Sequence, residues 1–352
     1  MSALTQQTGT SSLIHRTLPP RAVAGIAAGA AAVGAALALV LGLGPVMAVV
    51  LAVVALTIAL PLVSRQVEGP RRAADRLATI VVTIAFSLAI LPLLSLLITT
   101  IANGAGRFDW EFFTSDMRGV LGEGGGAYHA IVGTLLMTGA AALISVPVGV
   151  MTAIYLVEYG TGRLARAITM LVDVMTGIPS IVAGLFAYGL FALFFGPSIR
   201  FGLGGAVALS VLMIPTVVRS VEEMLKLVPN ELREASYALG VPKWRTILKV
   251  VLPTSAAGIA AGVMLAIARV IGETAPLLII AGATTNVNWN LFDGRMAALP
   301  VYTYYSYTIP GIPPEFGVER AWAGALTLFA IVMVLNLLAR LIARMFGTAK
   351  NR

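Results

Sequence analysis

The sequence contains no cysteine and only two histidines, His15 and His129, among its 352 residues. The absence of cysteine excludes a disulfide framework, a thiolate nucleophile and cysteine-ligated zinc or iron–sulfur centres. Two histidines leave little room for metal binding or for histidine-based acid–base chemistry. We therefore expect no catalytic residue, no metal site and no cofactor bound by this chain itself.

Charged residues are also scarce. They make up 11% of the chain, against about 25% in soluble domains, whereas 58% of the residues are hydrophobic. This balance excludes a water-soluble globule. The net charge of +8 does not indicate nucleic acid, because the basic residues stand at the ends of apolar runs rather than on one polar face. Membrane lipid is the expected surrounding medium, and no nucleic-acid partner is expected.

Long apolar runs dominate the sequence. A helix that crosses a bilayer needs about 20 mostly apolar residues, and eight runs of that kind occur. The sequence thus predicts an all-α integral membrane protein, a polytopic helical bundle. The eight runs are Ala22–Leu43, Pro45–Val63, Leu77–Ile101, Ala130–Val157, Ala167–Phe195, Leu203–Leu225, Val250–Ala283 and Ala321–Met345.

The distribution of Lys and Arg predicts the orientation of these spans. With the amino terminus inside, seventeen of the 24 basic residues fall in cytoplasmic segments and five fall outside. Cytoplasmic segments next to spans carry the excess of basic residues, so we expect both termini in the cytoplasm. The first apolar stretch runs on too long for a cleaved signal peptide and is interpreted as a retained anchor.

Two external segments, Asn103–Tyr128 and Thr284–Arg320, are rich in aromatic residues. Two interpretations stay open for them. Aromatic side chains form a belt where a membrane meets water, and they also suit a docking face for an extracytoplasmic partner.

The cytoplasmic loop 228–253 has the sequence pattern of two short helical pieces. Asn230 can cap the first piece, Gly240 suits a left-handed stop, and Pro242 suits the start of the second. One face is apolar and needs a cover, either from the bundle itself or from a partner. That face carries Leu232, Ala235 and Leu239.

The loop resembles the EAA loop of ABC importer permeases, whose pattern is E-A-A, three residues, G, nine residues, I, one residue, L-P. Two positions depart from it, Ser236 for the second Ala and Val250 for Ile, and both changes nearly conserve volume. The resemblance implies a type I (MetI-like) permease core whose loop seats in a groove of an ATPase subunit. The matching residues are Glu234, Ala235, Gly240, Leu252 and Pro253.

The chain has no G-x-x-x-x-G-K-[ST] phosphate-binding loop. ATP and Mg²⁺ are therefore expected on a separate ATPase subunit, and this chain is expected to be a non-catalytic membrane subunit.

Four candidates stand out among the ionisable residues inside predicted spans: Asp173, Arg219, Arg269 and Glu273. Burying an arginine in a span costs about 2.5–3.5 kcal/mol on insertion scales, so each is a functional candidate. Arg269 and Glu273 are four residues apart, which predicts one helix face. They either neutralise each other or hold an arginine ready for a tetrahedral oxyanion. Arg219 either faces the pathway or snorkels, and Asp173 either pairs with Arg219 or caps a helix.

Three stretches resemble the PstA-type permeases of phosphate-specific (Pst) ABC importers. These stretches are residues 177–185, 217–223 and 268–278, the last containing G-E-T-A-P-L-L. The resemblance implies that Arg219, Arg269 and Glu273 line the pathway of inorganic phosphate, with Thr274 and Asp173 as less certain members. It also implies a PstC-type partner permease, a PstB-type ATPase dimer and a PstS-type phosphate-binding protein, at a bacterial cytoplasmic membrane.

The resemblance also sets the expected organisation of the chain. Residues 1–76 hold an amino-terminal tail, an additional transmembrane hairpin and a basic loop, and residues 77–129 hold one helix and an external loop. Residues 130–346 form the permease core, and residues 347–352 form a cytoplasmic tail. The alternatives are a permease for sulfate, molybdate or a small organic solute and, further away, an ion-coupled secondary transporter.

Overall fold

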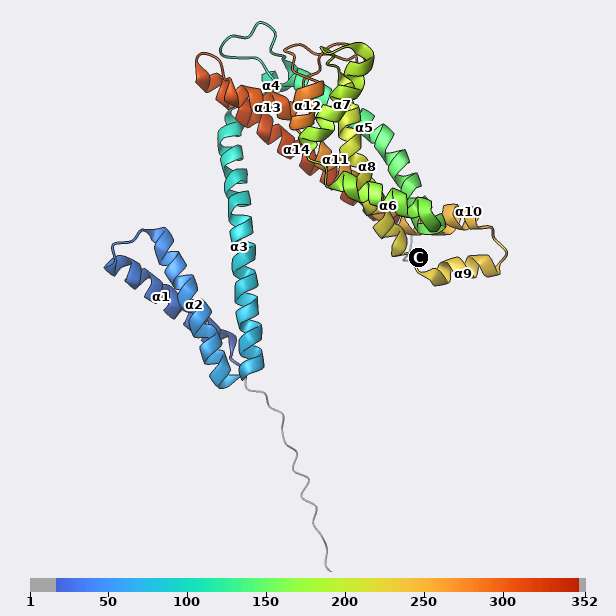
Figure 1. Ribbon diagram of the computed structural model, residues 1–352. Helices are drawn as coiled ribbons and strands as arrows, with labels where there is room; N and C mark the ends of the chain where they lie inside the picture. Colours follow the sequence, from blue (N-terminus) through green and yellow to red (C-terminus); the bar gives the residue numbers. More distant parts are fainter. Residues whose placement is uncertain (1–16, 348–352) are drawn as a thin grey trace, which may run out of the picture. The chain divides into compact units, whose positions relative to one another are not determined.

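A computed structural model describes residues 17–347, and every regular element within that range is a helix (Figure 1). Seven helices are long and apolar enough to cross a membrane, or eight if one bent pair counts as a single span. The prediction of an all-α polytopic membrane bundle is confirmed. The amino-terminal tail up to residue 16, with His15, and the tail from residue 348 lie outside the described residues.

The chain divides into two compact units, one ending at Leu97 and the other beginning at Ile98. The first unit contains α1 (Pro20–Val40), α2 (Pro45–Val67) and most of α3 (Pro70–Gly104). α1 and α2 form a hairpin with small residues at their contact. A Cβ at Gly34 would lie 2.4 Å from the backbone nitrogen of Ala52, so glycine permits this close approach.

Glu68 links the end of α2 to the start of α3 through hydrogen bonds and ion pairs. Its carboxylate accepts hydrogen bonds from Ser64 Oγ at 2.6 Å, from Arg76 Nε at 2.6 Å and from the backbone nitrogen of Leu18 at 2.8 Å. Because these donors favour the charged form, led by Arg76, they lower the pKa of Glu68 to about 2. The end of α2 is thereby tied to the first turns of α3.

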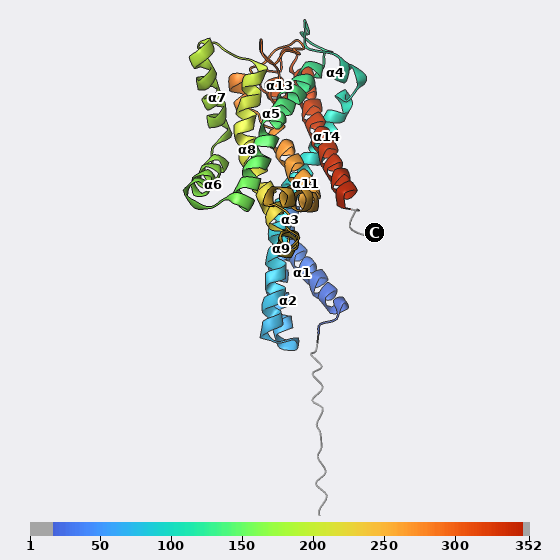
Figure 2. The same ribbon diagram turned by 90° about the vertical axis from the view of Figure 1, so that its right-hand side faces the viewer.

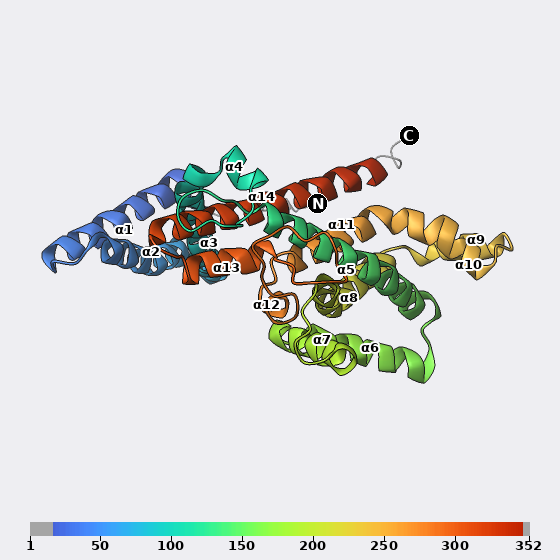
Figure 3. The ribbon, with the colours of Figure 1, turned by 90° about the horizontal axis from the view of Figure 1, so that it is seen from above.

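The second unit is a bundle around α8 (Gly202–Lys226), which packs beside α5 (Tyr128–Ile154) and α11 (Leu252–Val270) (Figures 2 and 3). The long helix α14 (Pro314–Gly347) packs against α11. The core is centred on α8, where Leu209, Met213 and Val217 are fully buried. α8 is therefore the axis of this unit, and it carries the candidate residue Arg219.

The fifth expected span, Ala167–Phe195, is not one helix. The structure has α6 (Gly162–Thr176) and α7 (Ser180–Phe195), bent by 110° at the break between them. Pro179 has no N–H for a helical hydrogen bond, and it disfavours helical backbone at the residue before it. The predicted continuous span is wrong for that reason.

The seventh expected span, Val250–Ala283, is also interrupted. α11 ends at Val270, and a separate helix, α12 (Ala275–Ile280), follows it. Pro276 sits in the first turn of α12, where its missing N–H costs nothing, whereas a continuous helix would lose that bond.

The two ends of this unit carry different connections. α4 (Trp110–Thr114), α12 and α13 (Leu299–Thr308) lie at one end, and α9 (Asn230–Ala238) and α10 (Lys243–Thr246) lie at the other (Figure 1). Short π-helical turns follow α5 at Tyr155–Tyr159 and α10 at Ile247–Val251. The aromatic residues of the first end divide between surface and core. Trp110 is 82% exposed, whereas Phe112 is fully buried.

Candidate functional site

Arg219 lies on α8, about two turns before its end. One guanidinium nitrogen, Nη2, contacts Asp173 of α6. The other, Nη1, donates to Glu222 at 2.8 Å, and Lys226 Nζ donates to the second oxygen of Glu222 at 2.7 Å. Of the two alternatives for Asp173, pairing with Arg219 is the one observed. Arg219 is therefore held between two carboxylates.

Arg269 reaches the same face of α8 from α11. Its Nη1 donates to the Thr216 hydroxyl at 3.4 Å, and Thr216 stands one turn before Arg219 on α8. The Arg269 side chain itself is exposed. Two arginines from different helices thus gather along one stretch of α8.

Glu273 does not share a helix face with Arg269, because α11 ends at Val270. Its backbone nitrogen bonds the carbonyl of Val270 at 3.1 Å. Within residues 17–347 no ion pair joins Arg269 to Glu273, so the expected pairing on one helix is wrong. Thr274 precedes the first turn of α12, and its carbonyl accepts from Leu278 N at 2.9 Å.

Two of the motif stretches pack directly against each other. A Cβ at Gly184 on α7 would lie 2.6 Å from Pro276 Cα on α12. Only a glycine allows the two backbones to approach this closely. The bent helix pair is thereby fixed beside the break that follows Arg269.

The loop between α8 and α11 presents an apolar surface. Leu239 is 83% exposed and Trp244 is 54% exposed, while Glu234 and Ala235 also lie at the surface. Gly240 adopts φ of +74° between α9 and α10, a backbone conformation that favours glycine. Leu252 and Pro253 begin α11, so the loop motif ends where a membrane helix starts.

Two details of this loop differ from expectation. Pro229, not Asn230, precedes the first turn of α9, and Asn230 makes no capping bond to a backbone amide. Its side-chain oxygen instead accepts from Arg233 at 3.3 Å. Ser236, where the family pattern has alanine, is buried and forms a 2.8 Å hydrogen bond with Thr246, which locks α9 to α10.

A buried ion pair joins this loop to the bundle, and it was not predicted from the sequence. Arg233 Nε and Nη2 donate to Glu158 Oε1 at 3.1 and 2.9 Å, and only 4% of the Glu158 side chain is exposed. Arg233 also donates to the carbonyls of Leu225 and Val228. A lone acid at the end of an apolar run, as in Tyr155–Tyr159, was the available signal.

The described residues hold no group of three His, Asp or Glu side chains arranged for a metal ion. The chemistry of the gathered residues is thus that of charged and hydroxyl groups. Two guanidinium groups and the Thr216 hydroxyl supply donors for an anion, and two carboxylates compete with it.

Comparison with known proteins matches residues 145–349 to a family described as "Binding-protein-dependent transport system inner membrane component". "Phosphate transport system permease protein PstA 1" of Mycobacterium tuberculosis (strain ATCC 25618 / H37Rv) is 47% identical over 287 residues, covering 80% of this chain and 91% of that protein. The corresponding PstA protein of Yersinia pestis is 38% identical over 281 residues, covering 79% and 92%. These matches confirm the resemblance to PstA-type permeases.

Solved structures support the fold. One chain of a bacterial alginate ABC transporter, in complex with an alginate pentasaccharide-bound periplasmic protein, matches with a TM-score of 0.55 at 13% identity. The match covers 80% of this chain and 98% of that chain. The protein is a multi-pass, non-catalytic inner membrane subunit, and it belongs to the family of binding-protein-dependent transport system inner membrane components.

Proposed function

We propose that this chain is a permease subunit of an ATP-driven phosphate importer and forms half of the translocation pathway. The observation that carries the proposal is the meeting of Arg219 and Arg269 along one stretch of α8. A guanidinium presents a planar fork of donors that fits a tetrahedral oxyanion. The relatives named as phosphate permeases, 47% and 38% identical, support phosphate as that anion.

The family implies an ATPase and a binding protein as partners. We assign these as a PstB-type ATPase dimer, which carries ATP and Mg²⁺, and a PstS-type phosphate-binding protein, with a PstC-type permease completing the pathway. The exposed apolar surface of α9 and α10 supports docking of the ATPase, because an uncovered apolar helix face suits a groove. The excess of Lys and Arg supports cytoplasmic termini.

Coupling starts at the loop. Glu234, Ala235 and Gly240 meet the ATPase, and Leu252 and Pro253 pass its motion into α11. Arg233 joins α9 to Glu158 after α5 and to the carbonyls at the end of α8. A displacement of α9 therefore acts on α5, α8 and α11 together.

Release of the anion depends on the carboxylates near the arginines. Asp173 and Glu222 form ion pairs with Arg219, so an arriving phosphate competes with these carboxylates for the guanidinium. The competition keeps binding weak enough for passage. The sequence spacing predicted this holding role for Glu273 toward Arg269, whereas the contacts support Asp173 and Glu222 toward Arg219 instead.

The test is radiolabelled phosphate uptake into vesicles that contain this chain with its partner permease and ATPase. We expect Arg269→Ala to reduce uptake about 100-fold, because charged hydrogen bonds contribute about 1.5–3 kcal/mol each. ATP hydrolysis without substrate is expected to persist, which shows that the complex has assembled.

The matched control is Arg163→Ala, an exposed basic residue at the start of α6 that does not line the cavity around Asp173 and Glu222. Its uptake is expected to stay within about twofold of wild type. Normal uptake by Arg269→Ala would reject the anion pathway, and competition by sulfate as effective as that by phosphate would reject phosphate as the substrate.

A further inference from the structure

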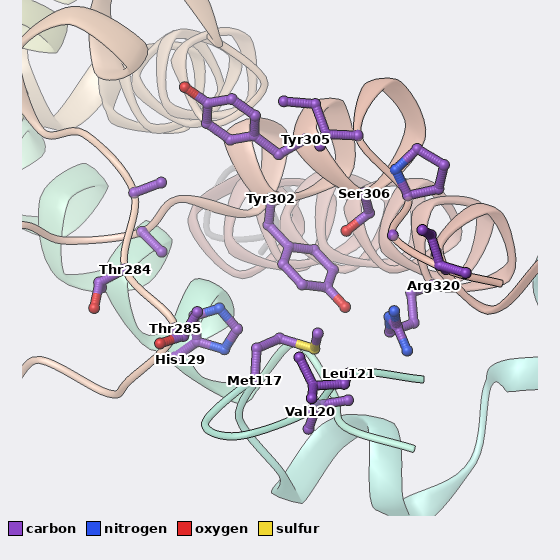
Figure 4. A pocket seen from close by; sticks show the side chains of 17 residues that line it. Met117, Val120, Leu121, His129, Thr284, Thr285, Tyr302, Tyr305, Ser306 and Arg320 are labelled. Atoms are coloured by element: carbon purple, nitrogen blue, oxygen red, sulfur yellow. The ribbon is translucent and has the colours of Figure 1, made fainter. Parts of the chain in front are cut away.

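A cavity of about 720 Å³ lies at the end of the second unit that carries α4 and α13. Its most deeply buried polar side chains come from three elements: His129 lies in the first turn of α5, Tyr302 lies on α13 and Arg320 lies on α14 (Figure 4). The rest of the lining is mainly apolar. Leu121 and Ile312, both 89% exposed, belong to that apolar part.

The three polar side chains are deeply buried, with exposed fractions of 3% for His129, 7% for Tyr302 and 6% for Arg320. Across residues 17–347, no group forms a hydrogen bond with His129 Nδ1, the Tyr302 hydroxyl or Arg320 Nε. The Tyr302 hydroxyl points toward the Arg320 guanidinium (Figure 4). Buried polar atoms without partners are rare, so three of them at one cavity indicate a ligand.

Arg320 is held in place without being neutralised. Its Nη1 donates to the carbonyls of Gly122 and Gly124 at 2.7 and 3.1 Å. In the part of the chain that the structure describes, no carboxylate forms an ion pair with it. Nearby Arg107 is itself paired with Asp109 and Glu111. The Arg320 guanidinium therefore keeps its positive charge without an ion pair, and Glu319, the preceding residue, is the acidic group that acts on it electrostatically.

Tyr302 serves as a neutral donor. Burial raises the pKa of its hydroxyl to about 12, so it keeps its proton at neutral pH. Its ring packs edge-on against His129 with centroids 5.5 Å apart. The Tyr302 hydroxyl thus faces the Arg320 guanidinium, while His129 packs beside the Tyr302 ring (Figure 4).

We propose that this cavity binds a small amphiphilic anion, consisting of a carboxylate or phosphate monoester head on an aliphatic body. Arg320 and Tyr302 hold the head, and the apolar lining around Leu121 and Ile312 holds the body. Two sources offer this chemistry, a free fatty acid and a single-chain lipid that ends in a phosphate monoester. Inorganic phosphate fits less well, because its four oxygens need more donors than this largely apolar cavity supplies.

The experiment uses the assembled complex and a 12-carbon carboxylate that carries a photoreactive diazirine near its end. Labelled peptides are mapped by mass spectrometry, and we expect labelling at residues 117–121 and 309–312. Laurate and dodecyl phosphate serve as competitors that distinguish the two sources. Dodecanol tests the need for charge, and inorganic phosphate tests the need for the aliphatic body.

The decisive variant is Tyr302→Phe, which removes one hydroxyl and keeps the ring that packs against His129, so the fold is expected to stay intact. We expect it to weaken the competition by laurate about tenfold, the value of one hydrogen bond to an anion. The matched control is Tyr305→Phe. Tyr305 lines the same cavity, but its hydroxyl points away from Arg320 (Figure 4). The affinity of Tyr305→Phe for laurate is therefore expected to equal that of wild type.

Three outcomes would overturn the proposal: equal affinity of wild type and Tyr302→Phe for laurate, equal competition by dodecanol, or displacement by inorganic phosphate at the same concentration as laurate. A fourth would do so as well. If Tyr302→Phe weakens association of the extracytoplasmic binding protein while no laurate-protected labelling occurs, the cavity receives a protein side chain instead.

Discussion

The α1–α2 hairpin and α8 are both long, apolar helical segments, but they differ in how much of their apolar surface is buried within the protein. Of the 18 residues in the apolar stretch of each helix, 17% are buried within the protein in α1 and 6% in α2, against 61% in α8. Lipid tails solvate Leu and Val as well as protein does. The hairpin therefore needs little protein around it, whereas α8 is built to be enclosed.

The placement of charge follows the same division. The last two turns of α8 carry Arg219, Glu222 and Lys226 in one network, whereas the hairpin confines its ion pairs to Glu68 at its base. A charge within a bundle needs a partner or a watery path. The comparison thus predicts that stability and transport depend on the ion-pair partners of charged residues in the core. Substitutions in the hairpin are expected to have smaller effects on transport.

The largest effect is expected when a buried charge of the core loses its partner. Arg233→Ala leaves Glu158 buried and unpaired, and breaking a buried pair in this way costs about 3–5 kcal/mol. We expect lower thermal stability of the complex and loss of substrate-stimulated ATP hydrolysis. Differential scanning fluorimetry and ATPase assays with and without loaded binding protein measure the two effects.

Arg245→Ala is the control in the same loop, because within residues 17–347 Arg245 makes no ion pair and stacks on Trp244, with its guanidinium carbon 5.2 Å from the ring centroid. Its stability is expected to change by less than about 1 kcal/mol. If Arg233→Ala and Arg245→Ala behave alike, the Glu158 link does not transmit motion and the contrast between the two regions weakens.

An intermediate effect on stability is expected when alanine replaces either of two glycines that lie against a neighbouring backbone. The effect on phosphate uptake is expected to distinguish the two. Gly184→Ala in the core and Gly34→Ala in the hairpin place a Cβ 2.6 Å from Pro276 Cα and 2.4 Å from Ala52 N. Overpacking of this kind costs about 1–3 kcal/mol. Both variants are expected to lower stability, but only Gly184→Ala is expected to reduce phosphate uptake.

Each of these variants has a control on its own helix. Gly189→Ala on α7 and Gly29→Ala on α1 have open space around the new Cβ, so neither stability nor uptake should fall. A drop in uptake with Gly34→Ala as large as with Gly184→Ala would show that the hairpin is part of the transport machinery, and the comparison would fail.

The smallest effect concerns pH and the base of the hairpin. The pKa of Glu68 falls from 4.5 to about 2 in the folded protein, so the unfolded form binds its proton first. The stabilisation is fully present above about pH 4.5 and is lost as the pH falls through 2. Thermal melts between pH 7 and pH 2 are expected to show this loss.

Glu68→Gln is expected to remove that part of the pH dependence, since the amide does not titrate. A melt of Glu68→Gln with the same acid dependence as wild type would show that other groups govern the acid stability of this unit.

The loop motif and the apolar runs could be predicted from the sequence because both are local. The spacing of Glu234, Gly240 and Pro253 needs only a reading along the chain, and the runs reflect the thickness of a bilayer. The expected spans failed at Pro179 and Pro276, where a single residue decides whether a helix continues. Length and composition do not register such a break.

The contacts of the candidate site could not be predicted in the same way. Arg219 meets Asp173 across 46 residues, Arg269 meets Thr216 across 53, and Arg233 meets Glu158 across 75. The spacing of Arg269 and Glu273 suggested a local pair, but the end of α11 removed it. Pairing across helices depends on which faces pack together.

The sequence by itself determined that this protein is an integral membrane protein, that it contains a loop of the ABC permease type and that arginines lie within its spans. These features follow from composition and local spacing. Only the tertiary structure decided which carboxylates hold Arg219, which hydroxyl Arg269 reaches and which unpartnered groups line the outer cavity. Such choices depend on the approach of helices far apart in the chain, and the packing of whole faces sets that approach.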